Sequence, residues 1–177
     1  DSEKLKAWEL GTKTSWELAG FLQANASFFF QDYTDKQVAT QIVSPGTGDL
    51  QPRILNAGGA EVWGLELEAT WQPEFVEGLT LFAAYTYLDA EYTEFFVESA
   101  ALRRAAGNGF CNVVDPTNNG DLTCRYDFSG RKLERTPDNA VVLTGDFARQ
   151  FFKQDFDWFT SVNASWQDER FSSEDNF

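Results

Sequence analysis

The stretch Trp63-Gly-Leu-Glu-Leu-Glu-Ala-Thr-Trp71 decides the fold class. Its odd-numbered residues are all apolar, and every one of its charged residues has an even number. Successive side chains of a β-strand point to opposite faces, so this stretch predicts a strand with one apolar face and one polar face.

The same alternation recurs along the chain and predicts an all-β protein. The six segments lie near residues 4–17, 21–43, 60–73, 79–95, 139–149 and 157–170. No apolar run approaches the roughly 20 residues that a transmembrane helix requires. The pattern therefore leaves two fold classes, a soluble β-fold and a membrane β-barrel.

The tryptophans favour the barrel. All six fall into pairs eight residues apart: Trp8 and Trp16, Trp63 and Trp71, Trp158 and Trp166. Eight residues of extended chain span about 26 Å, close to the apolar belt of about 25 Å on outer-membrane barrels. Aromatic girdles edge that belt at both water interfaces. We expect each pair to mark both girdles.

The connections between the segments alternate in length. Residues 18–20, 74–78 and 150–156 form short connections, whereas residues 44–59 and 96–138 form long ones. Outer-membrane barrels have short periplasmic turns and long extracellular loops. The alternation predicts an antiparallel, up-and-down transmembrane barrel with the long loops outside the cell.

Six strands are too few for a closed barrel, since single-chain outer-membrane barrels have at least eight. The chain also begins at Asp1 without an initiator Met or a leader. We therefore expect residues 1–177 to be a partial barrel domain of three hairpins, cut from a longer protein.

Composition excludes several classes of function. Asp and Glu number 28 against 14 Lys and Arg, and the net charge of −14 disfavours a nucleic-acid partner. The chain has no His, which removes His-based triads and the usual zinc sites. It also lacks a Gly-rich phosphate loop and an activated serine motif. We expect no enzyme activity, no cofactor and no metal site.

Two other interpretations of the pattern stay open. A soluble β-sandwich that binds carbohydrate would also show alternating faces, with its tryptophans buried or gathered in one groove. A porin-like barrel or an outer-membrane enzyme would share the girdles. The enzyme would need an acid, base or nucleophile cluster at one rim, and none is evident in the sequence.

Four motifs, in order, resemble the TonB-dependent receptors of Gram-negative outer membranes. Residues 3–13 (EKLKAWELGTK) are similar to the family's "YELGLK" strand, and residues 28–38 (FFFQDYTDKQV) to its "FYYDYKDLQV" strand. Residues 56–69 (NAGGAEVWGLELEA) match "NAG.A...G.ELE" most fully. Residues 78–92 then continue as the family's "GLTL…YLDAEY" strand does.

The resemblance implies a 22-stranded barrel in the bacterial outer membrane, with an N-terminal plug domain in its lumen. It implies import of a scarce nutrient, such as a ferric siderophore, with energy passed through TonB from the inner membrane. The plug and the remaining strands are absent from these 177 residues.

The long connection before residue 139 differs from the rest in charge. From Glu98 to Arg135 its net charge is +1, against −15 for the remainder. Its cations are Arg103, Arg104, Arg125, Arg131, Lys132 and Arg135. We expect them to attract an anionic ligand such as a ferric siderophore at the extracellular mouth. Alternatively, they contact lipopolysaccharide phosphates or only solvate the loop.

Two further features fall in or near this connection. A disulfide between Cys111 and Cys124 would suit an oxidising cell surface and would stabilise the loop by about 3 kcal/mol; the alternative is two free thiols. Oxygens suited to Ca²⁺ come from Asp115, Asn118, Asn119 and Asp121, but their spacing is not that of an EF-hand. In the third segment, Glu66 and Glu68 face the expected lumen, where they contact a plug, a ligand or only water.

Overall fold

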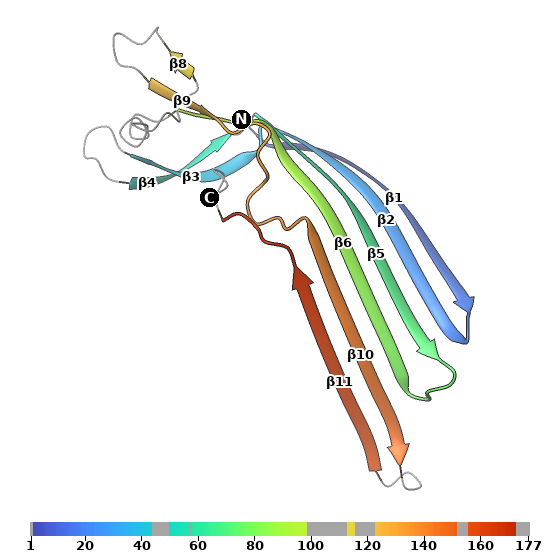
Figure 1. Ribbon diagram of the computed structural model, residues 1–177. Coiled ribbons are helices and arrows are strands. Elements are labelled where there is room, and N and C mark those ends of the chain that lie inside the picture. The colour runs from blue at the N-terminus through green and yellow to red at the C-terminus, as the bar shows by residue number, and fades with distance from the viewer. Residues whose placement is uncertain are drawn as a thin grey trace.

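The computed structural model describes residues 2–43, 50–56, 58–98, 113–115, 123–151 and 156–172. Six long antiparallel strands form one curved sheet in the order β1-β2-β5-β6-β10-β11 (Figure 1). They are β1 (Lys4–Glu17), β2 (Gly20–Thr34), β5 (Gly59–Pro73), β6 (Leu79–Glu94), β10 (Asn139–Phe151) and β11 (Phe156–Gln167). The all-β, up-and-down prediction is confirmed. The sheet does not close, and β1 and β11 form its two edges.

The register brings like residues together on each face. Ala24 of β2 pairs with Ala69 of β5, which pairs with Ala83 of β6. Directly opposed residues of antiparallel strands point to the same side, so the apolar positions of all six strands share one face. We call this the apolar face and its opposite the polar face. Where the structure describes the chain, no helix is long and apolar enough to cross a bilayer.

The prediction of one strand over residues 21–43 was wrong. Strand β2 ends at Thr34, and Asp35 has a left-handed φ of 56°. Its N–H donates to the Gly58 carbonyl at 3.0 Å, and its own carbonyl accepts from Asn56 Nδ2 at 2.8 Å. Asp tolerates this conformation better than most residues. The sequence pattern does not reveal the kink, because polar and apolar residues alternate with a period of two both before and after Asp35.

Beyond the kink, the first long connection carries its own hairpin. Strands β3 (Gln37–Val43) and β4 (Leu50–Asn56) pair as a two-stranded sheet. The second long connection holds a three-stranded sheet of β7 (Phe96–Glu98), β9 (Thr123–Asp127) and β8 (Val113–Asp115). Both lie at one end of the long strands, and the short turns lie at the other (Figure 1).

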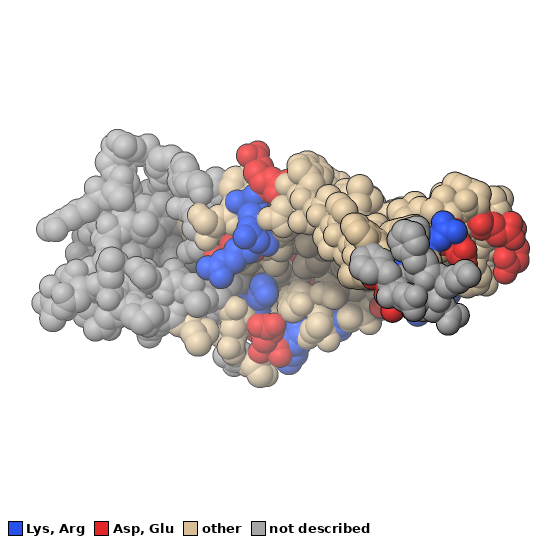
Figure 2. Space-filling view, turned by 90° about the horizontal axis from the view of Figure 1, so that it is seen from below, with Lys and Arg blue, Asp and Glu red and all other residues tan. Residues whose placement is uncertain are grey.

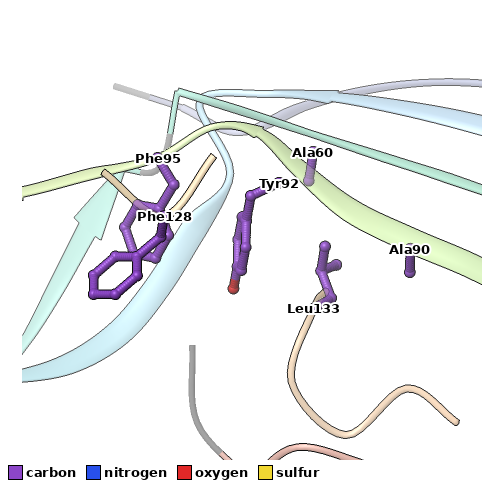
Figure 3. Close-up of a cluster of buried hydrophobic side chains, with 6 residues drawn as sticks. All are labelled: Ala60, Ala90, Tyr92, Phe95, Phe128 and Leu133. Atoms are coloured by element: carbon purple, nitrogen blue, oxygen red, sulfur yellow. The ribbon is translucent and has the colours of Figure 1, made fainter. Parts of the chain in front are cut away.

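A single cluster of buried apolar side chains lies at the loop end of the described structure (Figure 3). We call it the mouth cluster, and it consists of Ala60, Ala90, Tyr92, Phe95, Phe128 and Leu133. Residues 128–138, which we call the return segment, lead to β10 and run beside the end of β6. The Tyr92 N–H donates to the Arg131 carbonyl at 2.9 Å, and the Leu133 N–H donates to the Ala90 carbonyl at 2.8 Å.

A β-bulge explains why two aromatic residues three positions apart join this cluster. Ala60 pairs with Tyr92, but the preceding Gly59 pairs with Glu94, so Thr93 is an extra residue on β6. One extra residue reverses the alternation of faces. Tyr92 and Phe95 therefore point the same way, with ring centroids 4.7 Å apart (Figure 3).

Candidate functional site

Aromatic rings line the apolar face near the loop end. Trp8 pairs with Phe30, which pairs with Trp63, and the Trp8 and Phe30 centroids lie 5.8 Å apart. Tyr87 continues the row, 5.2 Å from Trp63. The Trp8 side chain is 56% exposed, so the described part of the chain does not cover this row.

A second aromatic row lies near the short turns. Trp16 and Trp71 both pair with Leu22. The Trp71 ring contacts Phe75 at 5.8 Å, and its Nε1 donates to the Leu18 carbonyl at 3.2 Å. The ring thus presents its apolar body to the face and its polar atom to the turn, as interfacial tryptophans do in membranes.

The tryptophans of β11 are staggered against those of β1. Trp166 of β11 is connected by successive residue pairs across the sheet to Thr12 of β1. Thr12 lies four residues beyond Trp8. An offset of four residues along the strand, accumulated over five spacings between neighbouring strands, corresponds to a strand tilt of about 30° from the barrel axis. Barrel strands tilt by about 35–45°, so tilted strands bring both tryptophans toward one level. Figure 1 shows the same offset at the lower ends of β10 and β11.

The band between the two rows is uncharged. On the six described strands, every apolar-face residue between the tryptophan rows is neutral. Small side chains, including Ala24, Ala69 and Ala83, line a shallow apolar hollow of about 530 Å³ there. An outward Lys or Arg at this depth of a bilayer costs about 2–4 kcal/mol. The band has the composition of a lipid-facing surface.

These features define a class, the wall of a membrane-spanning β-barrel. A sandwich would bury its tryptophans under a second sheet, yet among the described residues none of the six is buried. The chain belongs to the TonB-dependent receptors: the family model described as TonB dependent receptor-like, beta-barrel, matches residues 1–176. No curated protein matches the chain. The resemblance inferred from the four motifs is confirmed, and the family is one of outer-membrane receptors and transporters.

The polar face holds a hydrogen-bonded hollow of about 450 Å³. Ser27 Oγ donates to Glu9 Oε1 at 2.7 Å, and Asn25 Nδ2 donates to Glu68 Oε2 at 3.2 Å. Glu66 also lines the hollow, together with Lys13. The structure thus brings Glu66 and Glu68 together with a third carboxylate. Their contact with a plug or ligand stays a prediction.

Several predicted site residues lie outside the described part of the chain. Arg103, Arg104 and Cys111 are among them, as are Asn118, Asn119 and Asp121. Arg125 and Cys124 fall in β9, and Asp115 in β8, where only the backbone is described. The disulfide and the contacts of these cations therefore stay predictions.

The three described cations of the loop do not form one group. Lys132 lies opposite Glu91, which shares the apolar-face side of β6 with Tyr87, so Lys132 points outward. It forms an ion pair with Asp138. The hydrogen bond that Lys132 donates to the Asp138 carboxylate raises the pKa of Lys132, and burial opposes this rise.

Arg131 and Arg135 have different surroundings from Lys132. The Arg131 guanidinium lies over the Phe128 ring, 5.1 Å from its centroid. Arg135 is exposed, has a left-handed φ of 62°, and donates its N–H to the Phe171 carbonyl at 2.8 Å. Figure 2 shows Lys and Arg near the middle of the view with Asp and Glu directly beside them, and a further acidic group at the right-hand end.

One cation at this end was not predicted as a site residue. The Lys36 ammonium lies 4.6 Å from the centroid of the Tyr33 ring, and Tyr33 packs against the mouth cluster. The sequence contains no local signal for this, because the kink at Asp35 is what turns the chain back over the ring.

Proposed function

We propose that this chain is part of an outer-membrane receptor that imports a scarce anionic nutrient, most consistently a ferric siderophore. The observation that carries the proposal is the match of the receptor-barrel family along residues 1–176. In support, one face has the character of a lipid-facing surface and the other is polar and hydrogen-bonded.

In this proposal the six strands belong to a 22-stranded wall. The polar face lines the lumen and meets a plug domain, and the short turns lie in the periplasm. The loop end with the mouth cluster lies outside the cell. Ligand enters there, and TonB supplies the energy for import through the plug.

The loop cations have two roles in this scheme. Those on the inner side attract the anionic ligand, since clustered charges raise the local concentration of a counter-ion. Lys132 points outward just beyond the aromatic row and would meet lipopolysaccharide phosphates. A bridge between Cys111 and Cys124 would hold the outer part of this loop.

The test uses the full receptor in outer-membrane vesicles. Replacing Arg103, Arg104, Arg125, Arg131, Lys132 and Arg135 with Gln should weaken binding of anionic ferric chelates by at least about tenfold, because each charge-assisted hydrogen bond contributes about 1.5–3 kcal/mol. The control replaces Arg149 and Lys153, at or beside the short connection between β10 and β11, with Gln. Unchanged affinity in the six-site variant would contradict the proposed ligand class.

A further inference from the structure

The two long connections leave and rejoin the wall at one place. The first connection leaves after Tyr33, near the end of β2, and returns at Ala60, near the start of β5. The second leaves after Phe95, just beyond β6, and returns at Phe128, just beyond β9. We call these four residues the roots of the connections. Three of them belong to the mouth cluster, and Tyr33 packs against it.

Contacts join the four roots in one series. Tyr33 pairs with Ala60, and Ala60 pairs with Tyr92 of β6. The Tyr92 and Phe95 rings follow, with centroids 4.7 Å apart, and the Phe95 and Phe128 centroids lie 5.5 Å apart (Figure 3). The Phe128 N–H also donates to the Phe95 carbonyl at 2.8 Å. The series therefore runs without interruption from the first connection to the second.

The backbone at the roots is irregular, unlike the backbone of the wall. The strand ladder is interrupted by the kink at Asp35 and by the bulge at Thr93. On the return segment, Gly130 has a left-handed φ of 76°, and the segment meets β6 through an isolated bridge at Lys132 rather than a regular ladder. An interrupted ladder leaves more of the local order to side-chain packing.

The packing that orders the roots is concentrated in the mouth cluster. The buried hydrophobic core of the described residues consists of this cluster, and Phe95 within it is 0% exposed. Neither connection can leave the cluster without exposing rings that support the other connection to water, which is unfavourable. Segments that share a buried core in this way open together as one cooperative unit.

We propose that the roots of the two long connections open and close as one cooperative unit, with the mouth cluster as its core, while the wall stays paired. This property goes beyond the proposed function, because it makes the two connections one conformational device instead of two independent loops. Any contact that orders one connection thereby stabilises the other, since both depend on the same opening equilibrium.

Hydrogen exchange of the full receptor in outer-membrane vesicles, measured by mass spectrometry, tests the unit without any ligand. The reporters are two amides whose hydrogen bonds close the roots. The Asp35 N–H donates to the Gly58 carbonyl at 3.0 Å, and the Leu133 N–H donates to the Ala90 carbonyl at 2.8 Å. In the unsubstituted receptor their protection factors should agree within about fivefold, because one opening exposes both amides. A difference of about a hundredfold or more would mean two separate openings.

Substitutions at one connection are read at the other. Phe128→Leu keeps an apolar side chain in the cluster and should lower the protection factor of Asp35 about tenfold. Tyr33→Leu is the reciprocal variant and should lower the protection factor of Leu133 by about threefold, less because Tyr33 is only half-buried. The matched control is Phe30→Leu on the apolar face of β2, close to Asp35 but outside the cluster. It should change both protection factors by less than about twofold.

The outcomes decide between one unit and two. If Phe128→Leu lowers the protection factor of Leu133 and leaves that of Asp35 unchanged, the connections open independently and the inference is wrong. An equal loss at Asp35 in Phe30→Leu would also overturn it, since the effect would then be a general loosening of the sheet. The amides of residues 65–69 in β5 report on the wall and should stay protected in every variant. If they lose as much protection as Asp35, the opening unit is the whole sheet and the mouth is not separate.

Discussion

Aromatic residues serve opposite purposes in the wall and at the mouth. In the wall, Trp8 and Trp166 are 56% and 58% exposed on the apolar face. At the mouth, Tyr92 near the end of β6 and Phe95 just after it are 2% and 0% exposed, and they lie on the opposite, inner side of the sheet. The difference shows that the same residue type is stabilised by different surroundings at two heights of one sheet.

The physical reason lies in what covers each face. Lipid is as apolar as a protein core, so the apolar face of the wall needs no protein layer. Tyr92 and Phe95 lie on the other side of the sheet, where water rather than lipid would meet them, and rings exposed to water are unfavourable. The return segment that carries Phe128 and Leu133 supplies the missing cover there.

The largest effect is expected from opening the mouth cluster. Phe95→Ala should lower the unfolding free energy by about 3–5 kcal/mol, because a fully buried ring leaves a cavity. Phe95→Leu, which keeps most of the volume, should cost about 1 kcal/mol. Denaturant titration of the receptor in lipid vesicles measures both. Equal losses for the two variants would show that the ring is not packed as described.

A charge in the wall tests whether lipid covers the apolar face. Ala69→Arg should destabilise the folded barrel by about 1–3 kcal/mol, since the side chain would enter the apolar belt between its centre and the Trp71 row. The matched control is Thr70→Arg on the next residue, which points to the polar face and should cost much less. The same titration in vesicles applies. If Thr70→Arg proves the more costly of the two, the faces are assigned the wrong way round.

Close packing inside the wall is tested at a glycine. A Cβ at position 64 would lie 2.6 Å from Phe29 Cζ and from the Tyr87 carbonyl oxygen, so Gly64→Ala should cost about 1–3 kcal/mol. At Gly11 the nearest atom would lie 3.5 Å away, an ordinary contact, and Gly11→Ala should be neutral. A neutral Gly64→Ala would mean that the sheet is looser than the register implies.

The smallest effect is expected from the outward ion pair at the mouth. Lys132→Gln should cost at most about 1 kcal/mol, since both partners are more than a third exposed. The folded pKa of Lys132 lies above 10.5, so the stabilisation is complete below pH 10.5 and is lost as the pH rises through the folded value. Arg149→Gln, beside Glu77, should show no such dependence, because Arg stays charged. Stability measured across this pH range compares them.

The strands of the wall could be predicted from the sequence because their alternation repeats over many residues. Five of the six predicted segments lie within about three residues of β1, β5, β6, β10 and β11 at each end. The exception, residues 21–43, failed at a single kinked residue, Asp35. The bulge at Thr93 was also not predicted, since one extra residue within a strand leaves the alternation on either side intact.

The candidate site was predicted less completely than the wall. Net charge singled out the loop cations, but it could not separate Arg131, which covers a ring, from Lys132, which points outward. Lys36 lies 95 residues before Arg131 in the sequence, and no motif marks it. Its relation to Tyr33 and the mouth cluster depends on contacts between distant segments.

The sequence by itself determined the strand pattern, the paired tryptophans, the alternation of short and long connections and the receptor family. These are local or periodic properties, and a strand's two faces follow from its own residues. Only the tertiary structure decided the tilt of the tryptophan rows, the burial of the mouth cluster and the direction of each loop cation. These depend on register, on one bulge and on one kink, because shifting a strand by a single residue reverses which side chains meet.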